Sequence, residues 1–146
     1  SRVAKEYAPF GYSVMEDVTV NFDLIDTDTP DPITLAILPV DDADIYVESA
    51  HFYFGVKASN TTSNKVFFEV KRGDNDGSLS NSVALASGGV MDSNLKAAKT
   101  WHDMGIDQNQ VVEKGKVLYL NVDPQGTMTS VVVAAVSVNV RYRRKA

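Results

Sequence analysis

The last long apolar run of the chain, residues 127–142, constrains the fold more than any other segment. Its apolar side chains alternate with polar ones, in the order Val136, Ser137, Val138, Asn139, Val140, Arg141, Tyr142 and Arg143. A period of two is typical of a β-strand with one buried face and one solvated face. Because the run follows a turn-like sequence, we predict that it is the last strand of an all-β domain.

Six earlier segments have the same strand-like character and follow one another closely. They are residues 17–25, 33–38, 45–57, 66–71, 82–86 and 117–122. Clusters of glycine, proline, asparagine and aspartate separate most of them, which is typical of turns. With about eight short strands and almost no helical periodicity, the sequence predicts an all-β fold, an antiparallel β-sandwich that is jelly-roll-like.

Three local expectations accompany this fold. In residues 45–57, one face of the strand should contain Tyr46, Ala50, Phe52, Phe54 and Val56. Residues 123–126 have a proline early and a glycine late, which predicts a tight turn. For residues 94–100, a helical turn and a strand fit the mixed pattern equally well.

The first residues differ from the rest, and we divide the chain into an N-terminal arm, residues 1–16, and a single sandwich domain, residues 17–146. In the arm, Tyr7, Phe10 and Tyr12 lie among Pro9 and Gly11 without alternation. Two interpretations are open. The arm docks on a partner, or it packs on its own sandwich as an irregular first strand.

Composition excludes several kinds of chemistry. The chain contains no cysteine, which removes disulfides, thiolate nucleophiles and zinc sites built on sulfur. The first residues lack an apolar signal-peptide core, and no stretch approaches the roughly 20 apolar residues of a membrane helix. We therefore expect a chain without a leader and without membrane contact.

Charge is unevenly distributed along the chain, whose net charge is −5. Residues 1–50 carry 2 basic and 11 acidic side chains, whereas residues 51–146 carry 12 basic and 8 acidic ones. The acidic balance argues against direct nucleic-acid binding, which requires Lys and Arg to displace counterions from phosphates. The two signs either solvate loops on different parts of one surface or meet across copies of the chain.

Residues suited to catalysis are few. The two histidines are His51, in a predicted strand, and His102, beside Trp101. No nucleophile elbow of the form G-x-S-x-G occurs. The adjacent carboxylates Asp41 and Asp42 would point to opposite faces of a strand or lie solvated in a loop. We predict no enzymatic activity, no catalytic residue and no cofactor.

Other motifs have ordinary structural explanations beside their functional ones. Oxygen ligands suited to a hard cation occur in two clusters, Asp26, Asp28 and Asp31, and Asp74, Asn75 and Asp76. The second lacks the glutamate that closes an EF-hand loop at its twelfth position, where Leu85 stands, and we predict no metal site. Arg72-Gly73-Asp74 matches the integrin-recognition tripeptide, but Gly-Asp is also common in turns.

Aromatic residues offer one further possibility. Trp101, together with Tyr46, Tyr53 and Tyr119, either forms a stacking platform for a sugar or fills the core of the sandwich.

The order of the segments resembles that of the small jelly-roll capsid decoration, or cement, proteins of tailed-bacteriophage virions. In that family a long strand like residues 50–56 is followed by one like residues 66–73, and a final hairpin begins with a strand like residues 115–122. The resemblance covers about residues 17–142 and is one of patterning, without a signature motif.

The resemblance implies a virion structural protein that binds the outside of the assembled head. It also implies a homotrimer, the major capsid protein as partner, and a place on the capsid exterior after synthesis in the host cytoplasm. We expect contacts from the arm and from the basic end of the chain, through Tyr7, Phe10, Tyr12, Arg141, Arg143 and Arg144. The alternative is a carbohydrate- or receptor-binding β-sandwich module, for which Trp101 would stack on the ligand.

Overall fold

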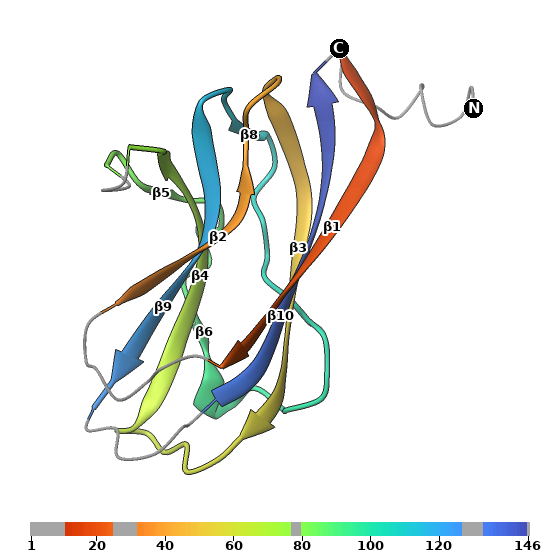
Figure 1. The fold of residues 1–146 in the computed structure, drawn as a ribbon. Coiled ribbons are helices and arrows are strands. Elements are labelled where there is room, and N and C mark those ends of the chain that lie inside the picture. Colours follow the sequence, from red (N-terminus) through yellow and green to blue (C-terminus); the bar gives the residue numbers. More distant parts are fainter. Residues whose placement is uncertain (1–10, 25–31, 77–79, 127–132, 146) are drawn as a thin grey trace.

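The structure is a computed structural model that describes residues 11–24, 32–76, 80–126 and 133–145. These residues form two antiparallel β-sheets packed face to face (Figure 1). The elements are β1 (Tyr12–Leu24), β2 (Ile33–Pro39), β3 (Ile45–Lys57), β4 (Lys65–Asp74), β5 (Val83–Ala84), β6 (Met91–Asp92), the 3-10 helix η1 (Ser93–Leu95), β7 (His102–Asp103), β8 (Gln110–Val112), β9 (Lys116–Gln125) and β10 (Val133–Lys145).

The strand order is that of a jelly roll. One sheet has the order β1-β10-β3-β7, with β8 also paired to β3, and the other has the order β2-β9-β4-β5, with β6 also paired to β4. The first strand therefore pairs with the last, and the last with the third. The second strand pairs with β9, and β9 with the fourth. This interleaving of two Greek keys is the jelly-roll arrangement, so the predicted fold is confirmed.

The core lies between the two sheets and is made of alternate side chains from the long strands. Val136, Val138 and Val140 of β10 are fully buried, as the alternating run predicted. The largest buried side chains are aromatic: the ring centroids of Phe52 and Phe68 lie 4.4 Å apart across the two sheets. Their contact joins β3 to β4 and therefore joins one layer to the other.

Burial along β3 changes phase at Glu48. The buried side chains are Ile45, Val47, Ala50, Phe52 and Phe54. The register with β10 shifts between Arg141 and Tyr142, as in a β-bulge, which inserts one extra residue and turns the following side chains to the other face. The prediction for Tyr46 is therefore wrong, because Tyr46 precedes the shift and is partly exposed. Val56 follows Phe54 by two residues but is 48% exposed near the strand end, so it is not part of the core.

The first strand begins earlier than predicted. β1 starts at Tyr12, whose partner in the register is Lys145, and the pairing is irregular between Tyr12 and Met15. Residues 12–16 therefore belong to the sandwich rather than to the arm, and for them the irregular first strand is the correct interpretation. The contacts that hold them come from the far end of the chain, which a local pattern does not reveal. Residues 1–10 lie outside the described residues.

The tight turn expected at residues 123–126 is absent because β9 continues to Gln125. Pro124 is buried within the strand and lies opposite Val66 of β4. Proline cannot donate a ladder hydrogen bond, so it is tolerated where one side of a strand has no partner. β2 pairs with β9 only as far as Val122, which leaves Pro124 a single strand neighbour in the described chain.

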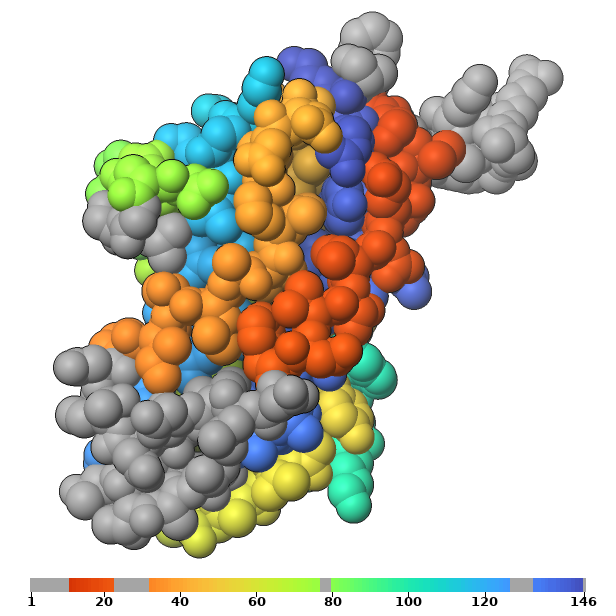
Figure 2. Space-filling model, in the orientation of Figure 1, coloured from red at the N-terminus to blue at the C-terminus, as the bar shows by residue number. Residues whose placement is uncertain are grey.

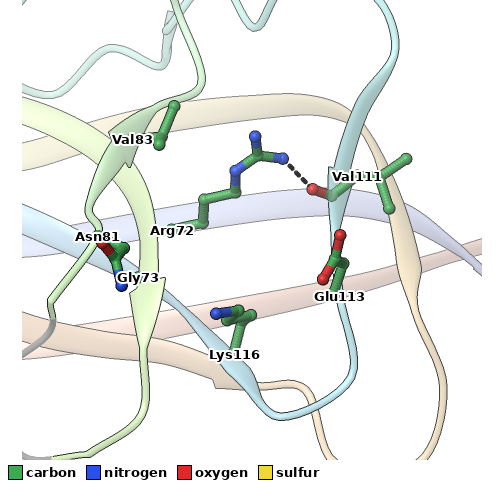
Figure 3. Close-up of a pocket in the computed structure, with 7 residues that line it drawn as sticks. All are labelled: Arg72, Gly73, Asn81, Val83, Val111, Glu113 and Lys116. Carbon is green, nitrogen blue, oxygen red and sulfur yellow. Dashed lines mark hydrogen bonds between the residues drawn. The ribbon is translucent and has the colours of Figure 1, made fainter.

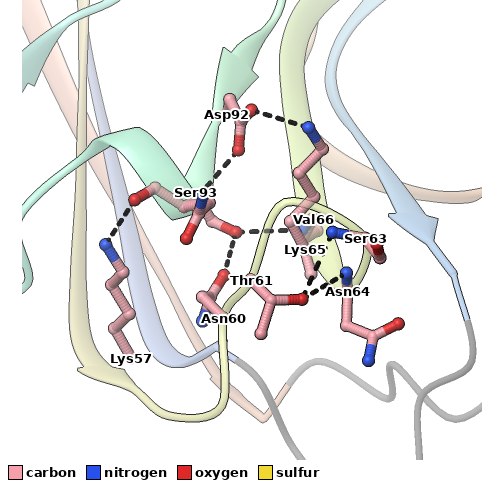
Figure 4. Close-up of polar contacts among 10 residues, drawn as sticks. Lys57, Asn60, Thr61, Ser63, Asn64, Lys65, Val66, Asp92 and Ser93 are labelled. Carbon is pink, nitrogen blue, oxygen red and sulfur yellow. Dashed lines mark hydrogen bonds and ion pairs between the residues drawn. The ribbon is translucent and has the colours of Figure 1, made fainter.

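The segment that leads to β7 is fastened to β3 and β4 (Figure 4). Ser93 is buried, and its hydroxyl accepts a hydrogen bond of 2.9 Å from the backbone N–H of Val66. The Lys57 ammonium donates to the carbonyl oxygens of Asn94 and Lys96, both at 2.8 Å. Within residues 94–100 the 3-10 turn reaches Leu95 and no strand is present, so the helical turn holds in part and the strand interpretation is wrong; the short strand β7 follows at His102.

We expect Phe52→Ala to lower the free energy of unfolding by about 3–5 kcal/mol, because the change removes a ring packed against both sheets. Urea unfolding followed by circular dichroism measures the effect. Leu95→Ala is the control: this side chain is 76% exposed, and its loss should change the free energy by less than about 0.5 kcal/mol. Equal values for the two variants would contradict the described core.

Candidate functional site

One side of the sandwich, which we call the β1–β2 side, leaves apolar residues incompletely covered by the described chain. β1 and β2 are the outer strands of their sheets there. The residues are Val14, Met15, Val18, Val20 and Phe22 of β1, and Ile33, Leu35 and Leu38 of β2. Val14 and Met15 are 47% and 41% exposed, and the other six are half-buried. In Figure 2, the atoms of β1 (red) and β2 (orange) border each other on one face.

The second candidate is a hollow on the outer face of the β1-β10-β3-β7 sheet. Thr19 lies opposite Asn139, Asn139 opposite His51, and His51 opposite Asp103, so one polar row crosses all four strands. On β1, β10 and β3 these positions alternate with buried or half-buried apolar residues, and their side chains therefore point outward. The hollow measures about 390 Å3 and is lined by Thr19, His51, Trp101, Asn139 and Arg141.

An aromatic pair borders the hollow. Trp101 is 48% exposed, and its ring centroid lies 5.4 Å from that of Tyr53, at an interplanar angle of 43°. Of the four aromatic residues considered as a platform, the structure brings these two together. Tyr119 is buried in the core, and Tyr46 instead packs against Tyr12, with centroids 5.7 Å apart.

Hydrogen bonds order the polar face of the sheet. The Asn139 amide nitrogen donates to Asp17 Oδ1 at 2.8 Å and to the Thr19 hydroxyl at 3.0 Å. One row further, the Ser137 hydroxyl donates to Asn21 Oδ1 at 2.6 Å. The sequence alone does not assign Thr19, His51 or Asn139 to a binding site. The sequence signal that points to them is the set of polar residues that alternate with the apolar ones along each strand.

Of the three interaction residues predicted in the arm, the structure describes Tyr12. Tyr7 and Phe10 lie outside the described residues. Tyr12 lies at the start of β1, where partial burial, followed by the nearby Asp44 and Tyr46, raises the pKa of its phenol. Tyr12 therefore packs within its own chain, against Tyr46 of β3.

The basic residues near the end of the chain have different surroundings. Arg143 is 8% exposed, and its Nε donates to Glu48 Oε1 at 2.7 Å. Arg144 contacts Glu16 at 3.3 Å, and this carboxylate raises the pKa of its guanidinium. Arg141 is exposed at the hollow, and no described carboxylate lies within ion-pair distance of it. Two of the three basic residues that we expected to contact a partner are therefore paired with carboxylates of the same chain.

The Arg-Gly-Asp sequence lies within β4, where both charged side chains have hydrogen-bond partners, and Figure 3 shows the contact of Arg72 with Val111. The Arg72 guanidinium donates to the backbone carbonyl of Val111, and Gly73 is buried. Asp74 accepts hydrogen bonds from Lys116 and from Asn81, which hold the pKa of this carboxyl below its usual value. The tripeptide is therefore part of the strand framework rather than an exposed recognition loop.

The next features are the carboxylates and histidines that could serve a metal ion or catalysis. Among the described residues, no three His, Asp or Glu side chains gather in a way that could hold a metal ion. The cluster of Asp26, Asp28 and Asp31 lies outside those residues. His102 Nε2 is 2.8 Å from the carbonyl oxygen of Ala97. His51 instead lines the hollow. No helix in the described part of the chain has the length and apolar character to cross a bilayer.

Comparisons with known proteins give only distant likenesses. No protein-family model and no curated protein matches the chain. A solved structure of infectious bursal disease virus, Gx strain, is 9% identical over 92% of this chain and 34% of its own, with a TM-score of 0.44. A structure from the Gt strain is 11% identical over 90% of this chain and 38% of its own, with a TM-score of 0.43. The chain spans little more than a third of theirs, and these likenesses carry no inference about its function.

We expect Glu48→Ala to destabilise the fold by about 1–3 kcal/mol, because it leaves the buried charge of Arg143 without its partner. Asp42→Ala is the matched control. Its side chain is 87% exposed and lies 3.9 Å from Arg144, so its loss should cost less than about 0.5 kcal/mol. Thermal and urea unfolding measure both variants, and an equal effect would argue against the structural role of Arg143.

Proposed function

We propose that this protein is a virion structural protein of the capsid decoration, or cement, type, which binds the outside of an assembled head and stabilises it. On this proposal its partner is the major capsid protein, it acts as a homotrimer on the capsid exterior after synthesis in the host cytoplasm, and it has no enzymatic activity.

The observation that carries the proposal is the apolar β1–β2 side of the jelly roll. Two outer strands there combine unpaired backbone edges with half-buried or exposed apolar side chains, within the described residues. A protein that stays alone in solution usually covers or charges such an edge, because it promotes association with another chain. The jelly-roll strand order supports the family resemblance of the sequence, and the β1–β2 side supplies a surface for assembly.

The stabilising effect has a simple physical basis. A block that binds only the assembled shell shifts the equilibrium toward that shell by mass action. A trimer that contacts several capsid subunits at once gains effective concentration for its later contacts, so each contact can be modest. A rigid sandwich suits this role because it transmits load without rearranging.

The pairing of charges within the chain leaves fewer basic residues for contacts with the capsid than the sequence predicts. Much of the basic end is already paired with the acidic first third, through Glu16 with Arg144 and Glu48 with Arg143. We therefore assign the contacts between copies and with the head to the apolar β1–β2 side and the arm. Arg143 and Arg144 act in the fold.

Replacing both Val14 and Met15 by Asp should weaken association, since charge on an apolar contact surface must be desolvated on binding. We expect light scattering to give about three times the 15.9 kDa of the chain for the unchanged protein and a lower mass for the variant. Binding to heads stripped of their decoration should fall roughly tenfold or more.

Val83→Asp is the matched control, because Val83 is 45% exposed on β5, at the opposite edge of the β2 sheet. It should leave mass and head binding unchanged. If the Val14 and Met15 variant keeps both properties, the β1–β2 side is not the contact surface.

Deleting residues 1–10 should weaken binding to heads while leaving the fold intact, because β1 begins at Tyr12. Co-sedimentation with decoration-free heads measures binding, and circular dichroism measures the fold. A truncated protein that binds as tightly as the full chain would remove the arm residues Tyr7 and Phe10 from the contact.

A further inference from the structure

We infer that the hollow on the outer face of the β1-β10-β3-β7 sheet is a carbohydrate-binding site for a neutral pyranose unit of an oligosaccharide. This binding activity is separate from the attachment to heads proposed above. It rests on three features of the hollow: its shape, its aromatic border and the balance of its charges.

The shape follows from the size of the side chains in the strand register. The rows in the middle of the sheet contain short polar residues, Thr19 with Asn139 and Asn21 with Ser137. Larger side chains, Trp101 on one flank and Arg141 on another, border them. Short residues between long ones leave a depression of about 390 Å3, which falls within the range of roughly 300–1,000 Å3 for ligand pockets.

The aromatic border suits one face of a sugar ring. The face of an indole carries negative charge from its π electrons, and the C–H bonds on one face of a pyranose carry partial positive charge. Trp101 is 48% exposed although it packs against Tyr53 at 5.4 Å. The tyrosine contact therefore orients the indole, while about half of its surface stays accessible to a ligand. A tryptophan that served only the core would be covered.

The polar groups supply donors and acceptors for hydroxyl groups. Asn139 is held by its amide nitrogen, which bonds to Asp17 and Thr19, and no described donor reaches its carbonyl oxygen. The Arg141 guanidinium has five N–H donors and no described ion-pair partner. His51 adds a ring nitrogen from β3. Asn139 and Arg141 lie on β10 and His51 lies on the adjacent β3, so the register of the sheet fixes their spacing before a ligand arrives.

Charge favours a neutral ligand over an acidic one. Asp17 lies opposite Arg141 in the register, and Asp103 lies opposite His51. Two carboxylates therefore lie beside the hollow together with the Arg141 guanidinium, and the chain as a whole carries a net charge of −5. A sugar carboxylate would meet this negative field, whereas hydroxyl groups can use the donors and acceptors without a charge of their own.

The test uses the full chain and isothermal titration calorimetry with neutral tetrasaccharides of glucose, mannose, galactose and N-acetylglucosamine. A tetrasaccharide of galacturonic acid is the acidic comparison. Because Trp101 is the only tryptophan in the chain, its fluorescence reports occupation of the hollow directly. We expect at least one neutral oligosaccharide to bind in the millimolar range and to shift the tryptophan emission.

Trp101→Ala and Arg141→Ala should each weaken this binding by roughly tenfold. The matched controls are Leu95→Ala, an apolar side chain 76% exposed, and Lys114→Ala, an exposed basic residue in the β8–β9 turn; both should bind as the unchanged protein does. Circular dichroism should show the same fold for all four variants, since each side chain is exposed.

Three results would overturn the inference. The first is that none of the neutral oligosaccharides binds. The second is that binding is equal in both hollow variants and both controls. The third is that the acidic oligosaccharide binds more tightly than every neutral one. Because the measurement uses free protein without heads, failure here leaves the decoration role standing. Failure of head binding likewise leaves the sugar site standing.

Discussion

The sandwich depends on the position of β10 between β1 and β3. The last strand of the chain pairs along its length with the first and the third, while its valines fill the core. The contacts between β1 and β10 join residues more than 100 positions apart, such as Ser137 and Asn21, so their formation closes long loops and costs conformational entropy. Burial of a continuous apolar face offsets that cost. Both candidate surfaces involve this sheet.

The same arrangement explains what becomes of the uneven charge. β10 carries the basic end of the chain directly between strands from its acidic first third. Arg143 therefore meets Glu48 of β3, and Arg144 meets Glu16 of β1. Since these partners lie on neighbouring strands, acidic residues of the first third and basic residues of the last strand pair within one chain. The exception is Arg141, which lies on the outer face just before the register shift and stays available to a ligand.

The two faces of β1 serve different kinds of contact. Toward the core, Val18, Val20 and Phe22 are half-covered, and another protein surface can complete their burial. Toward the outside, its polar residues Asp17, Thr19 and Asn21 join side chains of β10 through hydrogen bonds. Alternation of side chains along one strand thus places an association surface next to a polar hollow. The proposed decoration and sugar-binding roles use different side chains of this strand.

The sequence by itself determined the class of fold, the extent of β3 and the buried face of β10, because alternation is a local property that burial on one face imposes. It also singled out Trp101 and Tyr53, which pack together, although not Thr19 or Asn139 beside them. Only the tertiary structure decided the phase change at Glu48, the early start of β1 and the run of β9 through Pro124. Each of these depends on the register with a distant strand. The hollow likewise exists only where Thr19, Asn139 and His51 become neighbours, since their spacing across strands is set by pairing rather than by position along the chain.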